Sequence, residues 1–245
     1  MKKAILLTIS LFSIAGLFAG EEVRFLSDPA LSPDGRKIVF IFETDLWEVS
    51  SDGGTAYRLT GMTGNESSPC FSPDGRWLSF SSTQNGNADV YVMPVGGGKT
   101  LQLTYHEGND YPESWSWDSK MIYFTSDRNN TFGSYQVSVS GGTPERLFSD
   151  NYFNQAHSIV SSPDGSLFYF TTSWESYMFP QRKRYVGENN PDIECYNPRT
   201  GEYKRLTTWQ GKDLWPSADR NGMLYFASDE YNNEYNLYTL ENGEK

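Results

Sequence analysis

The sequence predicts an all-β protein, a β-propeller built from four-stranded antiparallel blades. The main observation is an internal repeat: the motif SPDG, followed by an apolar stretch, recurs along the chain in full or altered form. A period of about 40–50 residues is typical of solenoids, propellers and other repeat arrays. Apolar residues alternate after each motif, and this period of two indicates half-buried strands instead of helices. The copies begin at Ser32, Ser72, Ser116, Ser162 and Ser217.

Each repeat contains the same elements. Pro33, Asp34 and Gly35 form a turn, because proline restricts φ, aspartate bonds nearby backbone and glycine accepts a positive φ. A strand follows the turn, and a glycine turn later leads to a last strand ending in R-L-T or a related triplet. With a short strand before each SPDG turn, this predicts four strands per repeat, the number in a propeller blade. The third strands are expected at Asp45–Ser50, Asp89–Pro94, Ser134–Val139, Asp192–Asn197 and Asn236–Leu240.

The repeats form a single predicted propeller domain of residues 21–245. Blade four carries an insertion, Trp174–Asn190, between its second and third strands. The fifth copy stops before its outer strand, and an incomplete blade leaves an unpaired edge. We therefore expect about five blades, the fifth incomplete, as part of a six-bladed ring in a longer protein. The blades are predicted over residues 25–60, 66–104, 110–149, 155–207 and 213–245.

Residues 1–20 are predicted to be a signal peptide. Lys2 and Lys3 precede a short apolar run that ends in small residues, and Glu21 follows at once. An uncleaved anchor is the alternative. We expect an exported protein, periplasmic or extracellular in a bacterium, with no membrane span after cleavage. The net charge of −11 at pH 7 argues against nucleic acid as a partner and leaves cationic peptides as candidates.

No motif identifies a catalytic, cofactor or metal site, and we expect none of these. A G-x-S-x-G nucleophile elbow is absent, and the glycines at 96–98 before Lys99 lack the first glycine of a phosphate-binding loop. His106 and His157 lie just before inner strands and are candidate channel-mouth residues, but we find no convergent set of zinc ligands. A Ser-His-Asp triad stays open, because the spacing selects no serine.

Two groups of side chains could contact a ligand. Arg182, Lys183 and Arg184 form a basic cluster that could clamp a carboxylate, with a solvated loop as the alternative. The tryptophans could form a sugar-stacking platform, although most fall on strand positions that favour core packing. Trp174, in the insertion, is the best candidate for exposure. The tryptophans are Trp47, Trp77, Trp115, Trp117, Trp174, Trp209 and Trp215.

The remaining repeated or paired residues have structural interpretations. Asp34, Asp74 and Asp164 are expected to cap their own turns, with calcium binding as the alternative. Cys70 and Cys195 lie in blades two and four, so separate buried thiols are favoured over a disulfide, although export would permit one.

The repeat pattern resembles that of TolB-like β-propellers over nearly all of the mature chain. The pattern is SPDG and an apolar strand, then D-[LVI]-[WY], then a Gly-Gly turn closed by R-L-T. The propeller begins directly after the signal peptide, and blade four runs RKRYVG, PDIECY and TGE, which looks like the long fourth blade of tricorn-type serine proteases. Trp117, Ser119 and the segment SADRNG of blade five depart from the repeat.

The tricorn resemblance implies a six-bladed propeller ahead of a PDZ-like domain and a catalytic core. The catalytic Ser and His of that family lie in the later part of such proteins, so no catalytic residue can be assigned in this chain. The implied role is docking or gating of peptides or unfolded protein segments before cleavage elsewhere. The alternatives are a non-enzymatic TolB-like scaffold with a protein partner, and the propeller of a prolyl-oligopeptidase-like enzyme.

Overall fold

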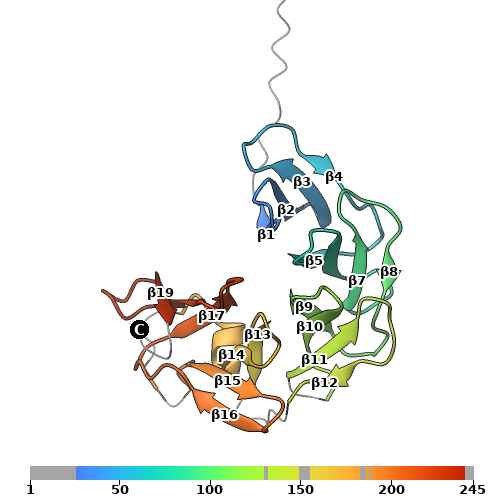
Figure 1. Ribbon diagram of the computed structural model, residues 1–245. Helices are drawn as coiled ribbons and strands as arrows, with labels where there is room; N and C mark the ends of the chain where they lie inside the picture. The colour runs from blue at the N-terminus through green and yellow to red at the C-terminus, as the bar shows by residue number, and fades with distance from the viewer. Residues whose placement is uncertain (1–25, 130–131, 149–154, 183–185, 188, 241–245) are drawn as a thin grey trace, which may run out of the picture.

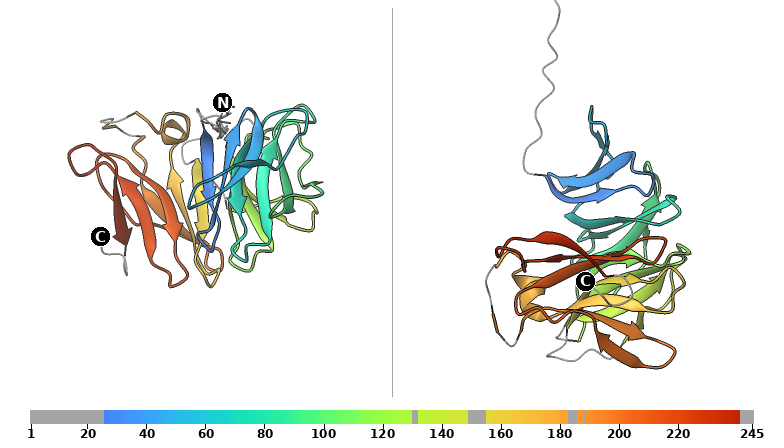
Figure 2. Two further views of the ribbon diagram at one scale, coloured as in Figure 1. Left: turned by 90° about the horizontal axis from the view of Figure 1, so that it is seen from above. Right: turned by 60° about the vertical axis from the view of Figure 1, so that its left-hand side comes forward.

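The computed structural model describes residues 26–129, 132–148, 155–182, 186–187 and 189–240. These residues form five antiparallel sheets that follow one another along an arc (Figure 1), which confirms the predicted β-propeller. Figure 2 shows the sheets packed face to face, as blades of a propeller are. Four blades have four strands, and the described part of blade five has three.

The strands of each blade are paired in sequence order. Blade one contains β1 (Ser27–Leu31), β2 (Lys37–Phe42), β3 (Asp45–Ser50) and β4 (Tyr57–Arg58). Blade two contains β5 (Glu66–Phe71), β6 (Trp77–Ser82), β7 (Asp89–Pro94) and β8 (Leu101–Gln102). Blade three contains β9 (Asp110–Trp115), β10 (Met121–Ser126), β11 (Gly133–Ser138) and β12 (Glu145–Arg146).

Blade four contains β13 (Ala156–Ser161), β14 (Phe168–Thr172), β15 (Ile193–Asn197) and β16 (Glu202–Arg205), with helix α1 (Trp174–Met178) between β14 and β15. Blade five contains β17 (Asp213–Ala218), β18 (Leu224–Ser228) and β19 (Asn236–Leu240). The first strand of each blade lies on the inner side of the arc (Figure 1), and β1, β5, β9, β13 and β17 contact one another in that order. The predicted third strands are reproduced in blades one, two and five, while β11 begins and ends one residue earlier than predicted and β15 begins one residue later.

The SPDG turns form as the residue types predict. Ser32 Oγ donates to Asp34 Oδ1 at 2.6 Å, and the same hydroxyl accepts from the backbone N–H of Lys37 at 2.9 Å. Gly35 has φ of 72°, a left-handed conformation that suits glycine. These hydrogen bonds lower the pKa of Asp34, and the corresponding bonds lower that of Asp164 to about 2. The aspartates therefore cap their own turns.

Apolar side chains of adjacent blades form the core. Phe80 and Tyr91 stack across β6 and β7 with ring centroids 5.9 Å apart, and equivalent stacked pairs occur in blades three and five. One cluster joins Val90 and Val92 of blade two to Trp115 of blade three, and similar clusters occupy the other junctions. Alternation along each strand thus buries both faces of a blade against its neighbours.

A carboxylate and a threonine clasp the outer strand to the third strand. In blade two, Thr104 Oγ1 accepts from the backbone N–H of Val90 at 2.9 Å and donates to Asp89 at 3.1 Å. Gln102 donates to both Asp89 and the Thr104 carbonyl, at 3.0 and 2.9 Å. We call this arrangement the Asp–Thr clasp. It recurs as Asp45 with Thr60 and as Asp192 with Thr207.

The junction between blades three and four lacks the clasp and uses aromatic packing. Gly133 and Phe148 occupy the positions of the aspartate and the threonine, and Ala156 replaces the acidic residue that begins the next inner strand elsewhere. The Phe148 ring packs on Phe170 with centroids 4.7 Å apart and on Tyr196 at 5.5 Å. Since all three polar positions change together, no buried carboxylate is left without its partner.

The outward face of blade five is exposed. Leu237 corresponds to Leu46 and Val90, which are fully buried between blades, yet its exposed fraction is 75%. The arc is partly bridged on the side of the SPDG turns, where Arg220 donates to the Pro73 carbonyl at 3.4 Å. Blade five thus presents an apolar sheet face of the kind that is buried at the other junctions.

We predict that Thr104→Ala lowers the free energy of unfolding by about 2–3 kcal/mol, because a buried N–H and a buried carboxylate oxygen lose their partner. Urea denaturation of the purified chain measures this loss. Thr104→Ser keeps the hydroxyl and should retain most of the stability, and Thr143→Ala on the exposed surface should change it by less than about 0.5 kcal/mol. Equal stability of Thr104→Ala and wild type would contradict a stabilising clasp.

Candidate functional site

The insertion of blade four is the main irregular element of the described fold. It leaves β14 at Ser173, forms helix α1 and returns to β15, between the second and third strands as expected. Ser173 caps the helix by accepting from the N–H of Ser176 at 3.4 Å. The Ser173 hydroxyl also donates to the Asn189 carbonyl at 2.7 Å, which ties the two ends of the insertion together.

A buried ion pair fixes the insertion to blade five. Lys212 Nζ lies 3.0 Å from Glu175 Oε2 and donates to the Phe179 carbonyl at 3.0 Å. The Lys212 side chain is 0% exposed and that of Glu175 is 4% exposed. A buried charge is tolerated only when it is paired, so this contact sets where α1 sits relative to the inner strand β17. Sequence reasoning missed Lys212, because a lone lysine before a strand resembles an ordinary loop residue.

Aromatic contacts extend the insertion over the two flanking blades. The Tyr235 hydroxyl of blade five donates to the Pro180 carbonyl at 2.8 Å. On the other side, Tyr177 packs against Phe132 of blade three with ring centroids 4.4 Å apart. The insertion therefore bridges blades three, four and five on the face opposite the SPDG turns, which we call the upper face.

The two histidines have different environments. His157 is the second residue of β13, whereas the sequence predicts it just before the strand, and its side chain is 3% exposed. Its Nε2 is 2.8 Å from Ser176 Oγ and its Nδ1 is 3.0 Å from Ser158 Oγ. Burial lowers the pKa of His157 to about 3, so the neutral ring joins β13 to α1. His106 is exposed in the connection to β9, where its Nδ1 accepts from the Gly108 N–H at 2.9 Å.

The predicted basic cluster is described only at its first residue. Arg182 Nη1 lies 3.5 Å from Glu175 Oε1, so its guanidinium is engaged by the same carboxylate that holds Lys212. Lys183, Arg184 and the Trp174 side chain lie outside the described residues. The proposed carboxylate clamp thus stays a prediction.

A bulge interrupts the inner strand of most blades. Asp28, Ser68, Ser158 and Trp215 have φ between 48° and 56°, and each lies where the strand register shifts. Side chains of the preceding blade satisfy the freed backbone groups: Asp28 accepts from the Ser68 N–H at 3.1 Å. The bulges thereby connect adjacent inner strands along the channel wall.

Glu113 performs this role between blades three and four. It sits at the register shift of β9, and its carboxylate accepts from the Ile159 N–H at 2.9 Å. Desolvation between the two strands raises the pKa of Glu113 to about 7, although hydrogen bonds from Ile159 and Ser158 lower it. The carboxyl group therefore titrates close to neutral pH inside the channel wall.

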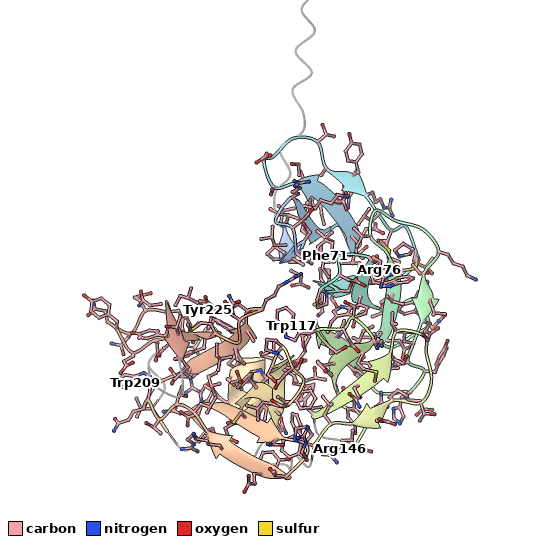
Figure 3. All side chains as sticks on the ribbon, in the orientation of Figure 1. Phe71, Arg76, Trp117, Arg146, Trp209 and Tyr225 are labelled. Carbon is pink, nitrogen blue, oxygen red and sulfur yellow. The ribbon has the colours of Figure 1, made fainter. Side chains whose placement is uncertain are left out.

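Among the tryptophan side chains that the structure describes, Trp115 and Trp117 pack as the sequence predicts. Trp115 Nε1 donates to Ser79 Oγ at 3.0 Å, and Trp117, on the inner side of the arc in Figure 3, donates to the Ser161 carbonyl at 3.0 Å. Trp215 instead is 45% exposed on the inner strand β17. The sequence signal that could have identified Trp215 is a tryptophan at the bulge position that holds Asp28, Ser68 and Ser158 in blades one, two and four.

The cysteines and the candidate metal ligands can be located in the described residues. Cys70 and Cys195 are both free thiols, and burial raises the pKa of Cys70 to about 12. Within the described ranges, no group of three metal-ligating residues comes together, and no helix is long and apolar enough to cross a membrane.

Comparison with known proteins identifies the family. The model of the tricorn protease N-terminal beta propeller domain matches residues 23–245. The chain belongs to this family. A tricorn protease homologue of Streptomyces coelicolor is 36% identical over 63 residues, which are 26% of this chain and 6% of that protein. The chain thus aligns with only a small part of the curated relative.

Solved structures share the fold. The crystal structure of the tricorn protease superposes with a TM-score of 0.70 and 19% identity, covering 90% of this chain and 22% of that one. TolB from Acinetobacter baumannii gives a TM-score of 0.63 and 24% identity, covering 90% of this chain and 52% of that one. At these identities the likeness concerns the propeller architecture alone.

We predict that Lys212→Met lowers the free energy of unfolding by about 3–5 kcal/mol, because it leaves the Glu175 carboxylate buried without its cation. The double variant Lys212→Met/Glu175→Leu should recover most of that loss, since both charges are gone. A double-mutant cycle by urea denaturation measures the coupling. Additive effects of the two substitutions would show that the pair does not anchor the insertion.

We predict that Glu113→Gln weakens the pH dependence of thermal stability between about pH 4.5 and 7. The folded-state pKa of Glu113 is raised from 4.5 to about 7, so its protonated form is favoured by folding. The stability from this group is complete below pH 4.5 and is lost as the pH rises towards 7. Melting temperatures across this window test it, with the exposed Glu107→Gln as a matched control. Parallel profiles for wild type and Glu113→Gln would contradict the prediction.

Proposed function

We propose that this propeller is the substrate-docking and gating domain of an exported tricorn-like serine peptidase and is itself non-catalytic. Its ligands would be peptides or unfolded protein segments, and a sixth blade in the intact protein would complete the ring. The observation that carries the proposal is the family match over residues 23–245, nearly the whole chain.

The geometry of the upper face supports docking over chemistry. The helix α1 is held by Lys212 of blade five and His157 of blade four, and Tyr235 holds Pro180 just after it, so this part of the insertion is a fixed rim beside the inner strands. Pre-organised surfaces bind extended segments without the cost of ordering a loop. His157, which has a hydroxyl neighbour in Ser176, is buried and neutral, a poor environment for a general base at neutral pH.

Export of the protein is part of the same proposal. The basic and apolar N-terminus supports secretion, and the acidic net charge of −11 favours cationic segments as ligands. A TolB-like scaffold that binds a folded protein partner is the second candidate, since TolB shares the propeller architecture.

Binding and hydrolysis assays on the purified 245-residue chain test the proposal. We expect unstructured cationic peptides to bind with micromolar affinity, measured by fluorescence anisotropy, and to be intact by mass spectrometry after prolonged incubation. Peptide cleavage by the chain alone would refute the non-catalytic role. A complete lack of peptide binding would refute docking and would favour the scaffold.

A further inference from the structure

Trp215 occupies a backbone position that blades one, two and four give to small polar residues and blade three gives to Pro112. The bulges of β1, β5 and β13 place Asp28, Ser68 and Ser158 in the left-handed region, and β17 places Trp215 there with φ of 56°. A left-handed conformation costs a bulky L-residue about 1–2 kcal/mol. At this position the sequence thus departs from its repeat by placing a bulky residue where the backbone conformation disfavours one.

The Trp215 indole is only partly buried. Trp215 is 45% exposed, whereas Trp115, on the inner strand of blade three, is 4% exposed. The Trp215 ring contacts that of Tyr235, at a centroid distance of 5.5 Å and an interplanar angle of 56°. Strained, partly exposed aromatic residues are characteristic of ligand-binding positions.

Tyr235 fixes this aromatic pair between the channel wall and the insertion. Its hydroxyl donates to the Pro180 carbonyl at 2.8 Å, so the ring cannot turn away without breaking that bond. The Lys212 ammonium holds the neighbouring Phe179 carbonyl at 3.0 Å. The Trp215–Tyr235 pair is therefore pre-organised, with one ring on the inner strand and the other beneath the insertion.

The surroundings of the pair are acidic. The connection that carries Tyr235 also contains Asp229, Glu230 and Glu234. Burial raises the pKa of Tyr235 to about 12, and the negative charges of Asp229 and Glu175 add to the effect. An aromatic surface in a negative field attracts apolar side chains flanked by cations.

We infer that the Trp215–Tyr235 pair is a subsite for one large apolar side chain of an extended peptide, with lysine or arginine beside that residue. This inference rests on the proposed docking function and specifies its ligand. The charge complementarity favours a cationic peptide, and the pre-organised rings provide the anchor that a few aromatic residues supply at most interfaces.

The variant Trp215→Ser tests the subsite, because serine already occupies the equivalent bulge in blades two and four. The probe is a fluorescein-labelled peptide of sequence Gly-Lys-Phe-Lys-Gly, titrated with the full chain. We expect Kd to rise roughly 30-fold in Trp215→Ser, in the range of a binding hot spot, and to stay within about threefold in Trp215→Phe. Tyr57→Ser, an exposed aromatic residue on the outer strand of blade one, should leave Kd unchanged.

Two further measurements separate binding from folding. The melting temperature of Trp215→Ser should stay close to that of wild type, because serine adopts the same left-handed backbone in blades two and four. On the wild-type chain, peptides with alanine in place of phenylalanine, or glutamate in place of lysine, should bind about tenfold more weakly. If Trp215→Ser fails to fold, Trp215→Phe must still show this discrimination between phenylalanine and alanine.

The outcomes distinguish this inference from the proposed function. Equal Kd values for wild type and Trp215→Ser would overturn the subsite and leave peptide docking intact. Absence of peptide binding to wild type would overturn both. Binding of chitohexaose or cellohexaose in place of the peptide, abolished by Trp215→Ser, would show that the aromatic pair stacks on sugar rings and would overturn the peptide ligand.

Discussion

The Asp–Thr clasp is the interaction on which blades one, two and four depend. The outer strands β4 and β8 contain two residues each, too few for backbone pairing alone to hold them firmly. The outer strand β12 of blade three is equally short, and there the aromatic packing of Phe148 takes the place of the clasp. The threonine hydroxyl accepts from a backbone N–H at the start of the third strand and lies within hydrogen-bond distance of a buried carboxylate. At the first junction, Thr60 Oγ1 lies between Asp45 Oδ1 and Glu66 Oε2 of the next inner strand, at 3.4 and 3.1 Å, so that its one proton is shared between two carboxylates. There, one side chain joins the end of the outer strand, the third strand and the following blade.

This constraint explains where the chain tolerates variation. At the junction of blades three and four, the clasp positions change together to Gly133, Phe148 and Ala156, because a buried carboxylate without its partner would cost more than an aromatic cluster. In blade four, the clasp of Asp192 with Thr207 fixes the start of β15 whatever precedes it. The insertion can therefore lengthen one connection without disturbing the strand register.

The architecture could be predicted well from the sequence, because the repeated turn residues and the alternating apolar residues determine where each strand begins and ends. Turn residues and a period of two place β3, β7 and β19 at the predicted bounds. Side-chain environments at the upper face were less predictable. The burial of Lys212 depends on Glu175, which lies 37 positions earlier in an insertion without a repeat counterpart. The bulges shift the register by one residue, so alternation cannot tell whether Trp215 faces core or solvent.

The insertion belongs to blade four by sequence, and two of its polar anchors come from blade five. Lys212 precedes β17 and Tyr235 precedes β19, so the polar contacts that hold residues 179 and 180 come from the same end of one sheet. A displacement of blade five must then carry the insertion with it, or break a buried ion pair. Since Trp215 lies on the same sheet and contacts Tyr235, the aromatic pair and the segment after α1 are positioned by one blade.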